Sequence, residues 1–160
     1  MTDTPWYEDI VMPALLRHAR GTYGGAMRRA LDVAGFDDLP RNGMWVLGVL
    51  ANGAEELPLG QLVRDLRVSK QAAGQLVDTL VARGYLDRNA DPVDRRKLTV
   101  ALTERGRAAA QAQAAAREAI DAELIASVGA EDVRRTRRTL AVLLDIARQH
   151  GGGTEAADAD

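Results

Sequence analysis

The positions of apolar residues along the chain, together with helix caps and glycine stops, predict a mostly helical protein. Residues such as Leu59, Leu62 and Leu66 recur at intervals of three and four, the spacing that places them on one face of a helix. Pro13 either kinks the first predicted helix or restarts it. We expect six helices, at about residues 5–34, 41–52, 59–66, 70–83, 104–128 and 130–150.

A hairpin is predicted between the fourth and fifth helices. Its first strand begins at Tyr85, and its second strand alternates between two faces, with Leu98, Val100 and Leu102 on one and Lys97, Thr99 and Ala101 on the other. A further short strand is predicted at Leu57. Two short helices joined by a tight turn and followed by a hairpin are the layout of a winged helix-turn-helix. The expected fold class is therefore mainly α with a small β-wing.

Composition excludes several classes of function. The 160 residues include no cysteine, so the chain has no disulfide scaffold, thiolate nucleophile or cysteine-based redox sensor. It has no Ser/His/Asp set, paired-carboxylate constellation, phosphate-binding loop or dinucleotide fingerprint, and we expect neither catalysis nor a cofactor. The only two histidines, His18 and His150, lie near opposite ends of the chain, which argues against a metal site.

The chain carries no sign of membrane insertion or export. No apolar run reaches the roughly 18 residues that span a bilayer. The first residues, from Met1 to Asp9, are acidic and unlike a signal peptide. We therefore expect a cytoplasmic protein that does not act at a membrane.

Positive charge is concentrated in one segment, although the net charge of the whole chain is −2. Residues 61–107 hold ten Lys and Arg against six Asp and Glu, a net charge of +4, whereas residues 1–60 and 108–160 each carry −3. A local basic surface attracts phosphates whatever the global sum. The segment with the predicted helix-turn-helix and hairpin is thus the candidate for binding nucleic acid.

The fourth predicted helix has one apolar and one polar face. A helical wheel places Ala73, Leu76, Val77 and Leu80 on the apolar face, and Gln71, Gly74, Gln75 and Asp78 on the polar one. Glutamine can pair with adenine, and glycine permits close approach to DNA. Ser69 and Lys70, at the start of the helix, are placed to meet phosphate. The alternative is a polar face that only contacts water.

The tip of the hairpin carries four charged residues, namely Asp94, Arg95, Arg96 and Lys97. An arginine at a hairpin tip can enter the narrow minor groove, where the negative potential is strongest. Asp94 can hold Arg96 in place with a charge-assisted hydrogen bond. The alternative is a solvated turn whose charges prevent edge-to-edge aggregation.

Two motifs resemble those of the multiple antibiotic resistance regulator (MarR) family. The wing signature is Asp94-x-Arg96-x-x-x-Val100-x-Leu102-Thr103-x-x-Gly106. The recognition-helix pattern is Leu66-x-x-Ser69 followed by Leu80-x-x-x-Gly84-Tyr85-Leu86-x-Arg88. This motif-level similarity covers residues 59–106, whereas the outer helices agree with the family only in number, length and order.

The resemblance implies a homodimeric transcription factor that binds an inverted-repeat operator in double-stranded DNA. It implies an N-terminal helix (1–35) in the dimerisation region, a DNA-binding domain (36–106) and C-terminal dimerisation helices (107–150), before an acidic tail (151–160) that we expect to be disordered. Family members usually repress, and many release DNA when a small, often aromatic or phenolic, ligand binds. By position, Arg96 would be the minor-groove arginine and Asp94 its partner.

A ligand pocket is expected near the first two helices. Its candidate residues are the aromatic side chains that could stack on an effector and the basic side chains that could bind its carboxylate, namely Trp6, Tyr7, Arg17, His18, Tyr23 and Trp45. Aromatic residues at helical spacing also form cores and dimer interfaces, so this alternative stays open. The competing function is a dimeric helical module that binds a ligand or a protein without binding DNA.

Overall fold

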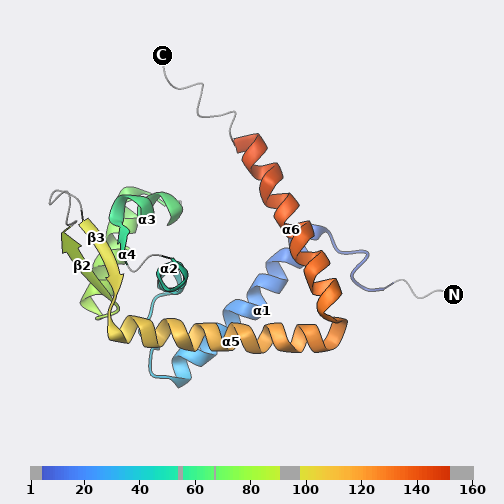
Figure 1. Cartoon of the computed structure of the whole chain (residues 1–160), viewed down its shortest axis with the longest axis horizontal. Helices are drawn as coiled ribbons and strands as arrows, with labels where there is room; N and C mark the ends of the chain where they lie inside the picture. The colour runs from blue at the N-terminus through green and yellow to red at the C-terminus, as the bar shows by residue number, and fades with distance from the viewer. Residues whose placement is uncertain (1–4, 54–55, 67, 91–97, 152–160) are drawn as a thin grey trace, which may run out of the picture. The chain divides into compact units, whose positions relative to one another are not determined.

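The chain forms six helices and a small sheet in the part that the structure describes. A computed structural model describes residues 5–53, 56–66, 68–90 and 98–151. The elements are α1 (Met12–Val33), α2 (Arg41–Asn52), β1 (Glu56–Pro58), α3 (Leu59–Leu66), α4 (Lys70–Ala82), β2 (Leu86–Ala90), β3 (Leu98–Leu102), α5 (Glu104–Val128) and α6 (Ala130–Gly151). The strands form one antiparallel sheet in the order β1-β3-β2 (Figure 1). The predicted fold class, mainly α with a small β-wing, is confirmed.

The start of the first helix was predicted too early. Residues 6–9 form turns, with the Glu8 amide donating to the Pro5 carbonyl at 2.9 Å, and α1 begins only at Met12. Pro13 occupies the first turn of α1. It has no amide hydrogen, so it cannot continue a helix from the residues before it, but its fixed φ suits a helix start. The alternative in which Pro13 restarts the helix is therefore correct.

The chain divides into two compact units, residues 1–118 and 119–160. The boundary falls inside α5, which Figure 1 shows as one unbroken helix. The first unit contains the sheet, the first four helices and the beginning of α5. The second contains the remainder of α5 and α6, where Arg137 Nη2 lies 3.4 Å from Asp121 Oδ2. No helix in the described part of the chain is long and apolar enough to cross a bilayer.

One apolar core holds the first unit together. Its fully buried side chains come from α1, α2, α3, α4, the sheet and the α1–α2 connection, and include Leu31, Leu39, Val46, Leu47, Leu62, Val77, Leu80, Tyr85, Leu86 and Val100. Each such side chain contributes about 1.5–3 kcal/mol by leaving water. The core thus fixes one face of α4 and leaves its opposite face exposed.

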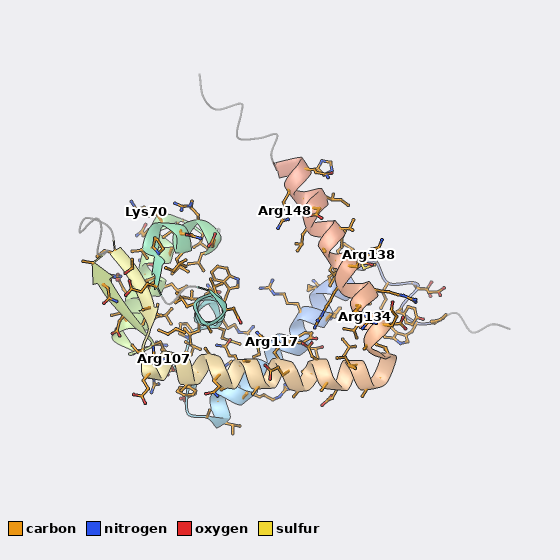
Figure 2. The ribbon with its side chains drawn as sticks, in the orientation of Figure 1. Lys70, Arg107, Arg117, Arg134, Arg138 and Arg148 are labelled. Atoms are coloured by element: carbon orange, nitrogen blue, oxygen red, sulfur yellow. The ribbon has the colours of Figure 1, made fainter. Side chains whose placement is uncertain are left out.

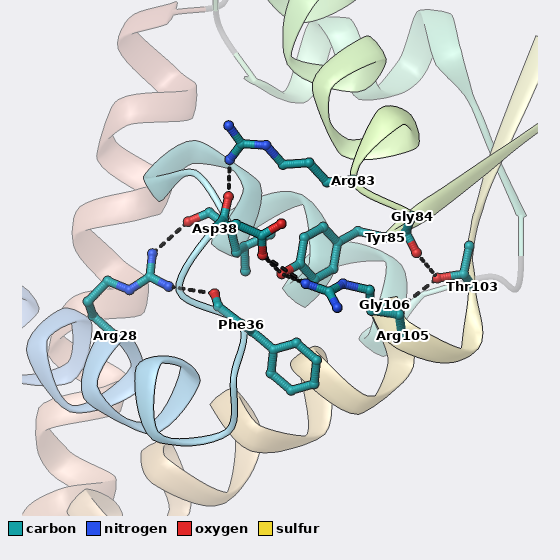
Figure 3. Close-up of polar contacts among 10 residues, drawn as sticks. Arg28, Phe36, Asp38, Arg83, Gly84, Tyr85, Thr103, Arg105 and Gly106 are labelled. Atoms are coloured by element: carbon teal, nitrogen blue, oxygen red, sulfur yellow. Dashed lines mark hydrogen bonds and ion pairs between the residues drawn. The ribbon is translucent and has the colours of Figure 1, made fainter.

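Tyr85 lies where α4 ends and the first turn of α5 arrives. Gly84 precedes it with a φ of 74°, a left-handed conformation that ends α4. Thr103 caps α5: its Oγ1 accepts a hydrogen bond from the Gly106 amide at 2.9 Å and donates to the Gly84 carbonyl at 2.5 Å (Figure 3). A Cβ on Gly106 would lie 2.1 Å from the Tyr85 carbonyl oxygen, so the two backbones meet without space for a side chain.

The Tyr85 side chain joins this junction to the connection between α1 and α2. Its hydroxyl donates to Asp38 Oδ1, and Arg105 Nη2 lies 2.9 Å from the same carboxylate oxygen (Figure 3). The Arg105 guanidinium also stacks over the Tyr85 ring, 4.7 Å from its centroid. The hydrogen bond from Tyr85 and the charge of Arg105 lower the pKa of Asp38, and burial raises the pKa of Tyr85. Asp38 is therefore ionised and Tyr85 neutral at pH 7.

Gly106→Ala should destabilise the protein by about 1–3 kcal/mol, because the new methyl group would overlap a backbone carbonyl that cannot move aside. Gly48→Ala is the matched control, since a Cβ on Gly48 meets nothing within 4 Å and alanine favours the helix. Urea unfolding followed by circular dichroism measures both variants. Equal stabilities for the two would show that α5 does not approach Tyr85 this closely.

Asp38→Asn should destabilise the protein at neutral pH, and the deficit should shrink in acid. A carboxylate whose pKa is lowered on folding stabilises the fold fully above its unfolded value, near 3.8 for Asp38, and loses this effect as the pH falls through its folded pKa. Unfolding free energies at pH 7, 5 and 3 test this prediction. Asp87→Asn, at an exposed position on β2, controls for removal of one negative charge. A deficit that persisted unchanged at pH 3 would contradict it.

Candidate nucleic-acid interface

α4 presents a polar face that the core leaves free. Ala73, Val77 and Leu80 are buried, whereas Gln71 and Gln75 are exposed on the opposite side. The helical wheel placed these residues on the correct faces. The apolar residues that recur three or four times in every two turns form one side of a helix, and this side packs against the core. Gln71 and Gln75 are one turn apart, so their amides can reach neighbouring points along a groove.

Gly74 lies between these two glutamines and has no evident role in the fold. A Cβ at Gly74 would meet nothing within 4 Å in the described part of the chain. A glycine inside a helix costs about 1 kcal/mol relative to alanine. Neither a tight contact nor an unusual backbone angle offsets that cost at this position. A glycine here instead leaves the backbone of α4 open to close approach from outside.

The start of α4 is suited to an anion. Ser69 caps the helix, its Oγ accepting a hydrogen bond from the Ala72 amide at 3.2 Å. Lys70 follows and is exposed (Figure 2). The first turn contains no acidic residue. The amides at the helix start and the partial positive charge of the helix dipole therefore add to the charge of Lys70.

The base of the wing is formed by β2 and β3. Their register pairs Asn89 with Thr99 and Ala90 with Leu98, the last pair before the connecting segment 91–97. The four charged residues predicted for the tip, Asp94, Arg95, Arg96 and Lys97, lie outside the described residues. Their roles stay predictions.

An ion pair joins the polar face of α4 to the wing. Arg88 of β2 donates from Nη2 to Asp78 Oδ1, and Asp78 follows Gln75 on the exposed side of α4. The sequence predicted Asp78 on the polar face of this helix and placed Arg88 at the end of the recognition-helix pattern, but it did not predict a contact between them. Their ten-residue separation spans a helix end and a strand, so no helical or strand periodicity could relate them.

Glu56 of β1 makes a second link to the wing. Its Oε1 accepts a hydrogen bond from Asn89 Nδ2 and its Oε2 accepts one from Thr99 Oγ1, both at 3.0 Å. Thr99 is only 4% exposed, whereas Leu98 is 40% exposed. Burial therefore does not follow the two predicted faces at these positions, and Glu56 provides the partner that the buried Thr99 hydroxyl requires.

A cavity of about 710 Å³ lies beside Glu56 within the first unit. It is lined by the end of α2, by β1 and β3, and by one side of α5, including Gly48, Asn52, Arg107, Gln111, Gln113 and Arg117 (Figure 2). Gln113 is 5% exposed, and its Nε2 has no hydrogen-bond partner in the described part of the chain. A buried donor without a partner is costly, so this amide would favour a ligand that accepts a hydrogen bond.

The six residues expected to form a ligand pocket do not line this cavity. Trp6 and Tyr7 are exposed before α1 and pack edge to face, with ring centroids 5.9 Å apart. Arg17 and His18 are exposed on α1. The other two are Tyr23, half-buried on α1, and Trp45, 41% exposed on α2. Gln113 could not be singled out from sequence because its burial follows from how α5 packs.

No group of three or more His, Cys, Asp and Glu side chains that could hold a metal ion occurs among the described residues.

The sequence of this chain matches a known family profile over its central part. The sequence profile of the MarR family matches residues 37–97, from within the α1–α2 connection to the residue before β3. No protein among the curated sequences matches the chain.

Solved structures share the fold over most of the chain. MepR of S. aureus in its DNA-binding conformation has a TM-score of 0.71 at 16% identity, over 86% of this chain and 99% of that one. The S. aureus MepR–DNA complex gives 0.69 at 17% identity, over 86% and 98%. Wild-type apo MarR from E. coli gives 0.62 at 21% identity, over 84% and 97%. The MarR family profile thus matches the central part of this chain, and the solved structures share its winged helix-turn-helix fold.

Proposed function

We propose that the protein is a homodimeric, sequence-specific DNA-binding transcriptional repressor that acts in the cytoplasm. The observation that carries this proposal is the polar face of α4, exposed beside a wing in a segment of net charge +4. Solved structures of MepR, which has the same fold, include a complex with DNA. The family profile and the solved structures that this chain matches are those of transcriptional regulators, so we propose no catalysis.

The binding mode follows from the chemistry of the exposed groups. α4 enters the major groove, where the amides of Gln71 and Gln75 pair with adenine and Gly74 allows the helix backbone close approach. Ser69 and Lys70 meet a phosphate at the helix start. Arg96, held by Asp94 and flanked by Arg95 and Lys97, reaches the minor groove. The contacts with bases in the major groove give sequence preference, and the contacts with phosphates and the minor groove give affinity.

The second copy in the dimer covers apolar side chains that a monomer leaves in water. Those on the end of α5 and on α6 are Leu124, Ile125, Val128, Leu140, Val142, Leu143, Leu144 and Ile146. Exposed apolar surface of this extent is typical of a protein interface. A two-fold dimer would present its two α4 helices to successive major grooves about 34 Å apart, which requires an inverted-repeat operator.

A small ligand in the cavity would release the DNA. A volume of about 710 Å³ suits a small organic molecule. Gln113 offers a buried donor, and the positive charges of Arg107 and Arg117 outweigh the negative charge of Glu56, so the lining favours a small carboxylate. We assign the effector to this cavity in preference to the exposed Trp6 and Tyr7, because the cavity holds a polar group that lacks a partner.

Arg96→Ala should lower operator affinity about tenfold, and it should reduce the salt dependence of binding by about one released counterion for each subunit of the dimer. The measurement is a titration at several salt concentrations with the DNA upstream of the protein's own gene, against a scrambled duplex. Arg148→Ala, on the exposed surface of α6, is the matched control and should bind as wild type.

The same titration tests the proposed function as a whole. Clear preference of the wild type for the upstream DNA supports a sequence-specific regulator. Equal, weak binding to both duplexes contradicts sequence-specific recognition of that DNA. No binding even at low salt favours the competing function, a dimeric helical module that binds a ligand or a protein without DNA.

Gln113→Leu should raise stability by about 1 kcal/mol, because it removes a buried donor without a partner. It should also raise at least tenfold the concentration of sodium benzoate or 4-hydroxybenzoate needed to release the operator. Gln149→Leu, at an exposed position on α6, is the control. Release of DNA at the wild-type concentration by the Gln113 variant would contradict an effector site at this amide.

A further inference from the structure

Glu56 belongs to both the wing base and the cavity. Its carboxylate accepts hydrogen bonds from Asn89 of β2 and Thr99 of β3. The same residue lines the cavity beside α2 and α5. It is also two residues from the end of β1, which runs directly into α3. A single side chain thus connects the wing to the helix-turn-helix and to the cavity wall.

The hydrogen bond to Asn89 goes beyond ordinary strand pairing. In the strand order β1-β3-β2, the central strand separates Glu56 from Asn89. The carboxylate therefore reaches across β3 to bond the outer strand. It does so at the pair formed by Asn89 and Thr99, one pair before the strands give way to residues 91–97. A two-stranded ribbon held only by its own backbone bonds twists readily, so this bridge constrains the end of the wing.

Burial of Thr99 strengthens one of the two hydrogen bonds of the bridge, whereas Glu56 and Asn89 are exposed. Thr99 is 4% exposed, and its hydroxyl donates to Glu56 Oε2. Without Glu56 this buried hydroxyl would lose the hydrogen bond that satisfies it. Hydrogen bonds to an ionised acceptor are about twice as strong as those between neutral groups.

We propose that Glu56 is a positioning residue for DNA binding, which sets the place of the wing from the wall of the cavity. It acts through Asn89 and Thr99 on the strand ends that flank residues 91–97, and so on the contact that Arg96 makes. The proposal rests on the proposed function, because it assigns Glu56 a part in the same DNA contact.

The sign of its effect separates this role from simple electrostatics. Removing a negative charge near DNA should tighten binding through reduced repulsion. If Glu56 positions the wing, Glu56→Ala should instead weaken operator binding, by up to the tenfold expected for Arg96→Ala. Asp87→Ala is the matched control on β2, where loss of an exposed carboxylate should leave binding unchanged or slightly tighter.

A double-mutant cycle on the operator tests the proposal. The variants are Glu56→Ala, Arg96→Ala and their combination, each titrated at several salt concentrations and checked for folding by circular dichroism. If Glu56 acts through the wing, the double variant should bind no more weakly than Arg96→Ala alone. Glu56→Gln keeps one carbonyl acceptor and should recover part of the affinity. Thr99→Val provides a second test should Glu56→Ala fail to fold.

The outcomes distinguish the two proposals. If the loss of affinity in the double variant equalled the product of the two single losses, the positioning role would be overturned, because Glu56 would then act independently of Arg96. Wild-type affinity for Glu56→Ala, with a loss for Arg96→Ala, would also overturn it while leaving the proposed function intact. If both Glu56→Ala and Arg96→Ala bound the operator with wild-type affinity, Arg96 would make no DNA contact. Glu56 could then have no role in positioning it.

Discussion

The close approach of α5 to the end of α4 constrains the rest of the first unit. Gly106 touches the Tyr85 carbonyl backbone to backbone, and Thr103 bonds both Gly84 and Gly106. The Tyr85 side chain extends the same junction to Asp38. Because α4 ends at this point, its direction is set by contacts that leave little space for adjustment. The exposed face of α4 can therefore vary in sequence without changing where the helix lies.

The groups that maintain the fold and the groups that we assign to DNA binding lie on opposite sides of α4. Ala73, Val77 and Leu80 provide burial, whereas Gln71 and Gln75 contribute nothing to the core. Polar links then bring the wing into register with this helix. The pair of Asp78 with Arg88 acts at the face of α4, and the Glu56 bridge acts at the next residue of β2, Asn89. The wing is thus held at two points by side chains.

The sequence predicted those features that depend on neighbouring residues. Ser69 as a cap, Gly84 as a helix end and the two faces of α4 all follow from local spacing, and each is present. The start of α1 was misjudged because two prolines gave the same local signal. The burial of Thr99, its bond to Glu56 and the unpaired amide of Gln113 could not be predicted, since each depends on segments brought together by the fold. Periodicity carries no information about such pairs.

Because α5 is one helix across the boundary between the two units, residues cannot be inserted into it or deleted from it freely. Inserting one residue after Gln113 would turn the following residues of α5 by about 100° about the helix axis and move them about 1.5 Å along it. The apolar side chains of Leu124, Ile125 and Val128 would then lie on another side of this helix. About seven residues, or two turns, must be added before the original direction is approximately restored. Length variation should therefore be better tolerated in the connections between elements than within this helix.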